Sequence, residues 1–84
     1  MDKLRERLVK CFAAVFPSLS ALEAPDASID TVPAWDSSHH FLLMQVIEEE
    51  FGIQIPEVVI GEIDSFSGFE IFLNGEGQAI LGNP

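Results

Sequence analysis

The sequence predicts an all-α fold: a small bundle of three main helices and one short helix, with a long loop between the first two helices. Stretches with an apolar residue at every third or fourth position indicate amphipathic helices. The chain of 84 residues is long enough for one small domain and too short for two. Its apolar fraction of 48% favours a folded core over a disordered chain.

The first helix is predicted over residues 2–16. Its apolar stripe follows helical spacing and comprises Leu4, Leu8, Cys11, Phe12 and Val15. Pro17 ends the helix because proline has no N–H to donate to the preceding turn. Cys11 is the chain's single cysteine and lies on the apolar stripe, so we expect a buried free thiol and no internal disulfide.

A long connection is predicted over residues 17–35, with a short turn within it. Three prolines interrupt this stretch, at positions 17, 25 and 33. A connection of this length in so small a domain is unusual, and we expect it to be functional or to pack on the body of the protein. The side chains expected to supply this packing are Leu19, Leu22, Ile29 and Val32.

The second helix is predicted to begin at Asp36 or Ser37, either of which can cap it, and to run to Phe51 before Gly52 ends it. Its core face comprises His40, Leu43, Met44, Ile47 and Phe51, whereas His39 is expected to face solvent. A second face comprises Ser38, Phe41, Gln45 and Glu48. An exposed Phe41 on this polar face indicates a contact site.

The last third of the chain predicts an extended loop, a short helical turn near residues 57–63, and a closing helix from Ser65 or Ser67 to Leu73. Its inward-facing side chains are Ile63, Phe66, Phe69, Phe72 and Leu73. Gly75 closes this helix. We therefore expect one domain over residues 1–76 and a flexible tail over residues 77–84.

The charges are distributed unevenly along the chain. The net charge is −10, and all four basic residues lie within the first ten positions. Residues 11–84 hold twelve acids (fourteen less Asp2 and Glu6) and no Lys or Arg. This pattern argues against binding to nucleic acid or anionic membranes and favours basic protein partners. The start of the chain lacks the apolar stretch of a signal peptide, and no run is long enough for a membrane span. We expect a cytoplasmic monomer without membrane insertion.

The stretch WDSSHH at residues 35–40 gathers an acid, two hydroxyls and two imidazoles. Neighbouring side chains on a helix diverge by about 100°, which argues against a catalytic triad and means that the two imidazoles cannot chelate one metal ion without a further ligand. A helix cap is one interpretation. Another is a serine that carries a phosphodiester, because the N-terminus of a helix stabilises an anion.

The stretch DSSHHFLLMQVIEEEFGIQIP at residues 36–56 resembles the centre of the acyl carrier proteins, which are small four-helix carriers. In that family a D-S-L motif opens the second helix, which continues to E-E-E-F-x-I-x-I-P. Asp36 and Ser37 match the start of this pattern, and residues 48–56 match its end at the family spacing. The likeness extends over about residues 2–74 and implies an acyl-carrier-like four-helix bundle.

The resemblance implies that Ser37 is the attachment site of 4′-phosphopantetheine, and that Asp36 is the acid used with a carrier synthase and its magnesium ion during transfer from coenzyme A. Such a protein is not an enzyme; it presents acyl groups as thioesters. The implied partners are a phosphopantetheinyl transferase, an acyl-loading ligase and acyl-processing enzymes with basic docking patches. The implied docking residues are Ser38, Phe41, Gln45, Glu48 and Glu49.

Several residues depart from the family pattern. Ser38 stands where the family has leucine, and His39 and His40 stand where acidic or small polar residues are common. Together with Trp35, these departures favour a specialised lipid or secondary-metabolite pathway over bulk fatty acid synthesis. The alternative from a different functional class is an unmodified acidic helical adaptor that binds a basic protein.

Overall fold

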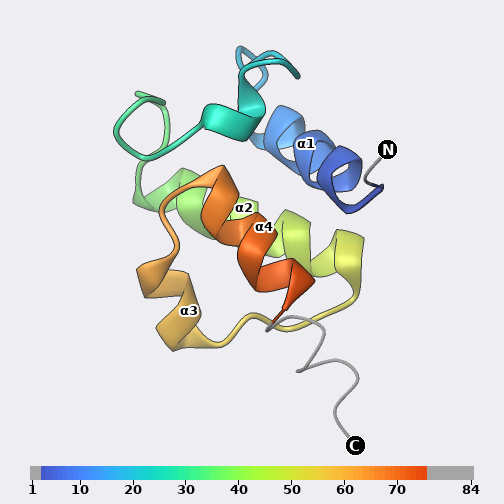
Figure 1. The fold of residues 1–84 in the computed structure, drawn as a ribbon. Coiled ribbons are helices and arrows are strands. Elements are labelled where there is room, and N and C mark those ends of the chain that lie inside the picture. Colours follow the sequence, from blue (N-terminus) through green and yellow to red (C-terminus); the bar gives the residue numbers. More distant parts are fainter. Residues whose placement is uncertain (1–2, 76–84) are drawn as a thin grey trace, which may run out of the picture.

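The computed structural model describes residues 3–75, and within this range the chain forms a small helical bundle without a β-strand (Figure 1). The all-α prediction is therefore confirmed. The elements in chain order are α1 Lys3–Val15, the 3-10 helix η1 Ala24–Asp26, α2 Ser37–Phe51, α3 Glu57–Glu62 and α4 Phe66–Asn74. The predicted tail at 77–84 lies outside the described residues.

The two ends of α2 are set by a capping side chain at one end and a left-handed glycine at the other. Asp36 is the N-cap, and its carboxylate accepts a hydrogen bond from His39 N at 2.9 Å. Ser37, the other predicted candidate for the cap, is the first residue of the helix. At the other end Gly52 adopts a left-handed conformation with φ of 66°, which glycine reaches without a steric penalty.

The ends of α1 and α4 also agree with the sequence. The last bond of α1 joins Phe16 N to Phe12 O, immediately before Pro17. Ser65 caps α4 by accepting a hydrogen bond from Gly68 N at 3.1 Å, so the closing helix begins after Ser65 rather than Ser67. Gly75 follows its last turn, as predicted.

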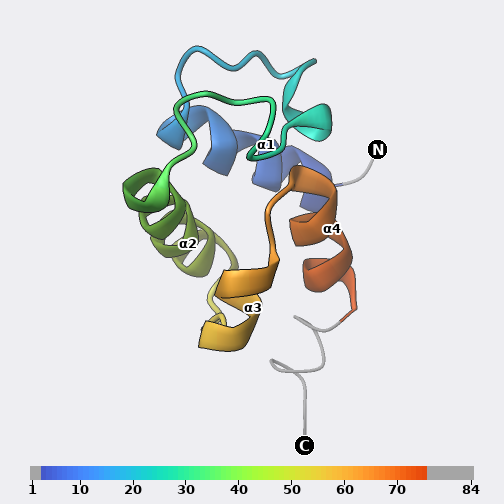
Figure 2. The same ribbon diagram turned by 90° about the vertical axis from the view of Figure 1, so that its left-hand side faces the viewer.

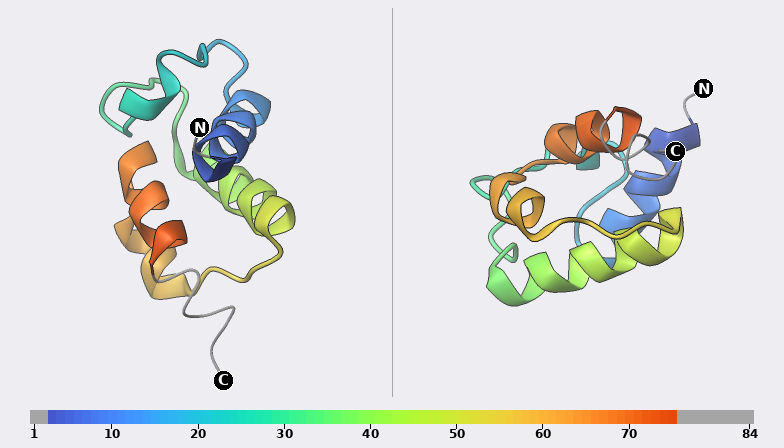
Figure 3. Two further views of the ribbon diagram at one scale, coloured as in Figure 1. Left: turned by 45° about the vertical axis from the view of Figure 1, so that its right-hand side comes forward. Right: turned by 90° about the horizontal axis from the view of Figure 1, so that it is seen from below.

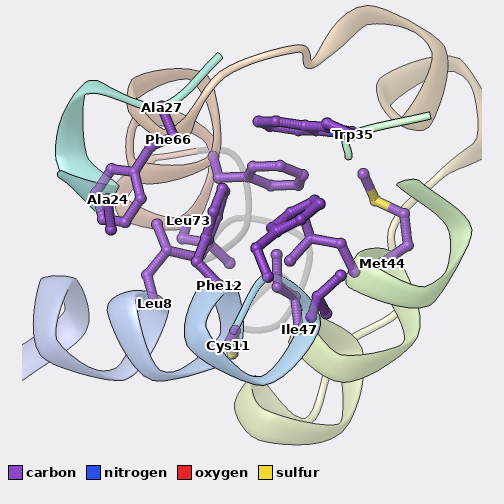
Figure 4. Packing of buried hydrophobic residues seen from close by; sticks show 14 of the residues in the cluster. Leu8, Cys11, Phe12, Ala24, Ala27, Trp35, Met44, Ile47, Phe66 and Leu73 are labelled. Atoms are coloured by element: carbon purple, nitrogen blue, oxygen red, sulfur yellow. The ribbon is translucent and has the colours of Figure 1, made fainter. Parts of the chain in front are cut away.

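The core is built around an aromatic cluster of Phe12, Phe16, Trp35, Phe66 and Phe69. Phe12 lies at its centre, with ring centroids 5.1 Å from Phe66 and 5.5 Å from Trp35. Aliphatic side chains from α1, α2 and α4 surround this cluster (Figure 4). Phe12 contacts Phe66 and Phe69 of α4, and α1 also packs against α2, so α1 holds the other two main helices together.

The long connection packs on the body of the protein, as expected, but partly through other residues than predicted. Val32 is buried and Leu19 packs partly against the core, whereas Leu22 is 91% exposed and Ile29 is 43% exposed. The prediction was wrong for Leu22 and Ile29. Their place is taken by side chains that the pattern did not single out, namely Ala24, Ala27 and Trp35.

The reason is that the connection approaches α4 through its backbone. Ile29 N donates to Asp64 O, and Phe66 N donates to Ala27 O, both at 2.9 Å. This antiparallel bridge fixes the segment near Ser28 beside the start of α4. Small alanine side chains allow η1 to lie close to α1 and α4.

Helix α3 is the peripheral element. It lies across the N-terminal part of α2, on the side away from α1 (Figures 2 and 3). None of its residues is fully buried. The segment before it is firmly held, because Ile53 and Ile55 are buried and Ile55 N donates to Glu48 Oε2 at 2.8 Å.

Two arginines of α1 tie the main helices together at the surface. Arg5 Nε pairs with Glu70 of α4, and Arg7 Nε pairs with Glu50 of α2, both at 2.7 Å. The guanidinium of Arg7 also lies 4.5 Å from the centroid of the Phe51 ring. Phe51 is therefore half-buried beneath a cation, rather than fully enclosed as its predicted core position implied.

Candidate functional site

The N-terminus of α2 borders a cleft of about 470 Å³ that lies between α2, α3 and the long connection. Its apolar lining consists of Ile29, Phe41, Ile60 and Ile63. Ser37 and Asp36 lie on its margin. No residue that lines the cleft is fully buried, so the cleft is a groove open to solvent.

Ser37 is well placed to carry a covalent group. It is exposed and occupies the first turn of α2. Its side chain is not needed as the helix cap, because the Asp36 carboxylate makes the capping hydrogen bond. The first turn of a helix presents unpaired N–H groups and the positive end of the helix dipole. An anionic group on the Ser37 hydroxyl would therefore lie in a favourable field beside an apolar groove.

Asp36 binds its neighbour His39 twice. Asp36 Oδ1 accepts from His39 N at 2.9 Å and lies 2.8 Å from His39 Nδ1. The backbone hydrogen bond, followed by the side-chain one, lowers the pKa of Asp36 below its usual value. His39 was expected to face solvent, but it is only partly exposed, because its ring stacks on Phe16 with centroids 5.8 Å apart.

His40 occupies a different environment, between a core tryptophan and α3. Trp35 Nε1 donates to His40 Nδ1 at 2.9 Å, and His40 Nε2 lies 2.8 Å from Ile60 O. An indole N–H can only donate, and a carbonyl oxygen can only accept. These partners assign the neutral His40 ring with its proton on Nε2. His40 is half-buried, in keeping with its predicted place on the core face of α2.

The two imidazoles therefore do not converge. His39 pairs with Asp36, whereas both nitrogens of His40 are taken by Trp35 and Ile60. Among the residues that the structure describes, no group of three or more His, Cys, Asp or Glu side chains could hold a metal ion.

The outer face of α2, defined here as Ser38, Phe41, Gln45 and Glu49, is exposed. Phe41 is 63% exposed, which confirms the prediction of an apolar side chain on a polar surface. Leu42 beside it is 46% exposed, an addition that helical spacing did not single out. This surface could contact a partner without any rearrangement of the bundle.

Two of the three acids at the end of α2 make contacts within the protein. Glu48 is half-buried and holds the backbone at Ile55, and Glu50 pairs with Arg7. Glu49 is exposed. Of the two acids predicted to contact partners, Glu49 is thus the more available, while Glu48 already has an intramolecular role.

Cys11 lies away from this cleft, on the buried face of α1. Burial, followed by the negative charge of Glu50, raises the pKa of its thiol to about 11. A thiol of this kind is unreactive near neutral pH. The expectation of a buried free cysteine is confirmed.

None of the helices in residues 3–75 combines the length and apolar character needed to cross a membrane. No family model matches this chain, and no curated protein or solved structure matches it significantly.

Proposed function

We propose that this protein is an acyl carrier protein that carries acyl groups as thioesters on a 4′-phosphopantetheine arm attached to Ser37. The observation that carries the proposal is the position of Ser37. It is an exposed serine on the first turn of α2, directly after a capping acid and at the margin of an apolar groove. The unusual neighbours Trp35, Ser38 and His40 favour a dedicated lipid or secondary-metabolite pathway.

The residues present fit the arm in two respects. The phosphodiester would lie on Ser37 Oγ at the positive end of α2, where an anion is stabilised. The groove that Ser37 borders is lined by Phe41, Ile60 and Ile63, so it offers an apolar surface to a chain attached at the serine. When attached, the arm would supply a terminal thiol for thioester formation.

Attachment needs a transferase and coenzyme A. In that step the Ser37 Oγ–P bond forms, the bond between the two bridging phosphates of coenzyme A breaks, the adenosine bisphosphate half leaves, and the serine proton passes to a base of the transferase. Asp36 is the adjacent acid that the family employs with magnesium. In the free protein its carboxylate is bound to His39, so the transferase would have to reach it in competition with this imidazole.

The outer face of α2 is the proposed docking surface for the transferase, the acyl-loading ligase and the acyl-processing enzymes. Phe41 offers an apolar anchor, and Glu49 offers a negative charge for a basic patch. Ser38 makes this surface more polar than a leucine would, which favours dedicated partners. Arg5 and Arg7 are paired within the protein, with Glu70 and Glu50.

The test is the intact mass of the protein after incubation with coenzyme A, magnesium and a broad-specificity phosphopantetheinyl transferase, followed by peptide mapping. We expect one added phosphopantetheine on Ser37. Ser37→Ala should abolish the addition. Ser38→Ala alters the docking face but keeps Ser37, so it should still gain one phosphopantetheine on Ser37 when the reaction has gone to completion, whatever its effect on the rate. Because Ser37 does not cap α2, Ser37→Ala should change the free energy of unfolding by no more than about 0.5 kcal/mol.

Failure of several transferases to modify the folded wild-type protein would contradict the proposal. The exposed acidic helix would then favour the adaptor, in which the same face of α2 binds a basic protein and Ser37 remains unmodified.

A further inference from the structure

We propose that His40 is a positioning residue that holds α3 against α2 and thereby restricts the groove beside Ser37 to short acyl groups. This inference deepens the carrier function and rests on it. It depends on three observations: the two hydrogen bonds of His40, the light packing of α3, and the filled core behind His40.

The two hydrogen bonds place His40 as a link between the core and α3. Its Nδ1 accepts from Trp35 Nε1 at 2.9 Å, and its Nε2 donates to Ile60 O at 2.8 Å. The His40 and Trp35 rings are also stacked, with centroids 6.0 Å apart and planes inclined by 28°. The ring therefore cannot turn away from Ile60 without losing its contact with Trp35.

Apart from this bond, helix α3 is held by partial packing, since Val59 and Ile60 contact the core but are only partly buried. It has no fully buried residue, its N-cap is Pro56, which makes no side-chain capping bond, and Val58 is 67% exposed. The chain is fixed just before it, where Ile55 N donates to Glu48, and just after it, where Asp64 O accepts from Ile29 N. Residues 57–63 can therefore swing outward as a unit between two fixed points once the bond from His40 to Ile60 breaks.

The interior behind His40 offers no alternative space. Trp35 is 3% exposed, stacks on Phe69 with centroids 6.5 Å apart, and meets Phe12 edge-on at 5.5 Å. Displacing this indole would disrupt the aromatic cluster that joins the main helices. An acyl chain that enters the groove thus meets His40, with Trp35 packed behind it, and a longer chain needs α3 to move.

These constraints define the cargo class. The groove accepts a short apolar acyl group between Phe41, Ile60 and Ile63 while the His40 bond stays intact. A long chain must either break that bond or remain in solvent. One hydrogen bond corresponds to about a tenfold change in such an opening equilibrium.

The experiment loads wild type, His40→Ala and His40→Gln with acyl arms from acetyl-, butyryl-, hexanoyl- and octanoyl-coenzyme A through the same transferase. The readout is the rate of thioester cleavage by hydroxylamine, relative to the urea-unfolded protein. In wild type we expect butyryl to be protected and octanoyl to be cleaved about as fast as in the unfolded protein. His40→Ala should protect octanoyl about tenfold better, because α3 is then free to move.

His40→Gln is the conservative variant, since its amide can accept from Trp35 and donate to Ile60. It should retain the wild-type dependence on chain length. Val58→Ala is the matched control, because it changes an exposed side chain of α3 that does not line the groove. Circular dichroism establishes that each variant is folded. A merely structural role for His40 would destabilise the protein without changing the order of protection among the four acyl groups.

Hydrogen exchange in the unloaded protein tests the same link without the arm. A six-residue helix released from the bundle is too short to keep its own hydrogen bonds. The amides of Ile60 and Ile63, which donate to Pro56 O and Val59 O, should therefore exchange about tenfold faster in His40→Ala than in wild type, relative to amides of α4. Unchanged exchange would overturn the role of His40. Octanoyl protection in wild type, or identical profiles in wild type and His40→Ala, would overturn the limit on chain length. Absence of loading in wild type would instead refute the carrier function.

Discussion

The hydrogen bond between Trp35 and His40 makes a quantitative prediction about stability. We consider the single variants Trp35→Phe and His40→Ala and the double variant that combines them. His40→Ala removes the acceptor of a buried indole N–H, whose residue is only 3% exposed. A buried donor left without a partner costs about 1–3 kcal/mol. A domain of this size has about 3–5 kcal/mol of stability, so the loss is large but leaves a folded protein.

Trp35→Phe removes the donor instead. His40 is half-buried, so its Nδ1 can accept from water in this variant, and most of the loss comes from packing. In the double variant no indole donor remains to be left unpaired. The packing change is common to both sides of the cycle and cancels. The double variant should therefore be less destabilised than the sum of the singles, by about 1 kcal/mol.

The assay is urea unfolding of the four proteins followed by far-ultraviolet circular dichroism, because Trp35 is the chain's single tryptophan and its fluorescence is lost in two of them. A second cycle that pairs Trp35→Phe with Val58→Ala should be additive, since Val58 is exposed on α3. Additivity within about 0.3 kcal/mol in the Trp35–His40 cycle would refute the energetic link that we assign to these side chains.

Three further predictions concern local features of the fold. Gly52→Ala should destabilise the protein by about 1 kcal/mol, because φ is 66° at this position. Gly61→Ala in α3 should stabilise it by about 0.5–1 kcal/mol, because alanine favours the helix and its Cβ would meet no atom within 4 Å. Urea unfolding measures both free energies, and changes of the same sign would contradict the assignment of opposite backbone conformations to these glycines. The folded-state pKa of Asp36 is lowered, so its carboxylate contributes stability above the unfolded-state pKa of about 3.9 that is lost as the pH falls through the folded-state value. The difference in melting temperature between wild type and Asp36→Asn should shrink from pH 6 toward pH 2, and a constant difference would contradict the assignment. The thiol of Cys11, with its pKa raised to about 11, should react slowly with an aromatic disulfide reagent at pH 8 in the native protein and rapidly in urea; comparable rates would mean that the site is open.

The main helices could be predicted because their signals are local. Apolar spacing places Leu8 and Phe12 on one face of α1, and cap chemistry marks Asp36, Gly52 and Ser65 as boundaries. These rules act within a turn or two of a helix, so the sequence contains the information directly.

The packing of the long connection could not be predicted in the same way. Leu22 is exposed and Ala24 is buried, the reverse of what hydrophobicity alone indicates. Which residue is buried depends on where the connection meets α4, and that is set by the backbone bridge between Ser28 and Ser65, which are far apart in the chain. Trp35 is buried for a similar reason, because it reaches a cluster assembled from distant segments.

In the candidate site, too, some features follow from local sequence signals and others depend on contacts between distant segments. The exposure of Phe41 and the position of Ser37 at the start of α2 follow from helical spacing and capping. The bond from His40 to Ile60 spans twenty residues, so no local pattern revealed it. Likewise, the sequence pattern indicates surface charges at Glu48 and Glu50, because it does not show that Ile55 and Arg7 lie beside them.

The light packing of α3 has an evolutionary consequence. Since this helix contributes no fully buried residue, substitutions at its exposed positions, such as Val58, cost little folding stability, whereas substitutions in the aromatic cluster remove core contacts. One wall of the groove beside Ser37 can therefore vary while the bundle that supports it stays constant. If the chain is the carrier proposed above, new cargo preferences in its descendants would arise first in residues 57–63, where substitutions at exposed positions change folding stability least.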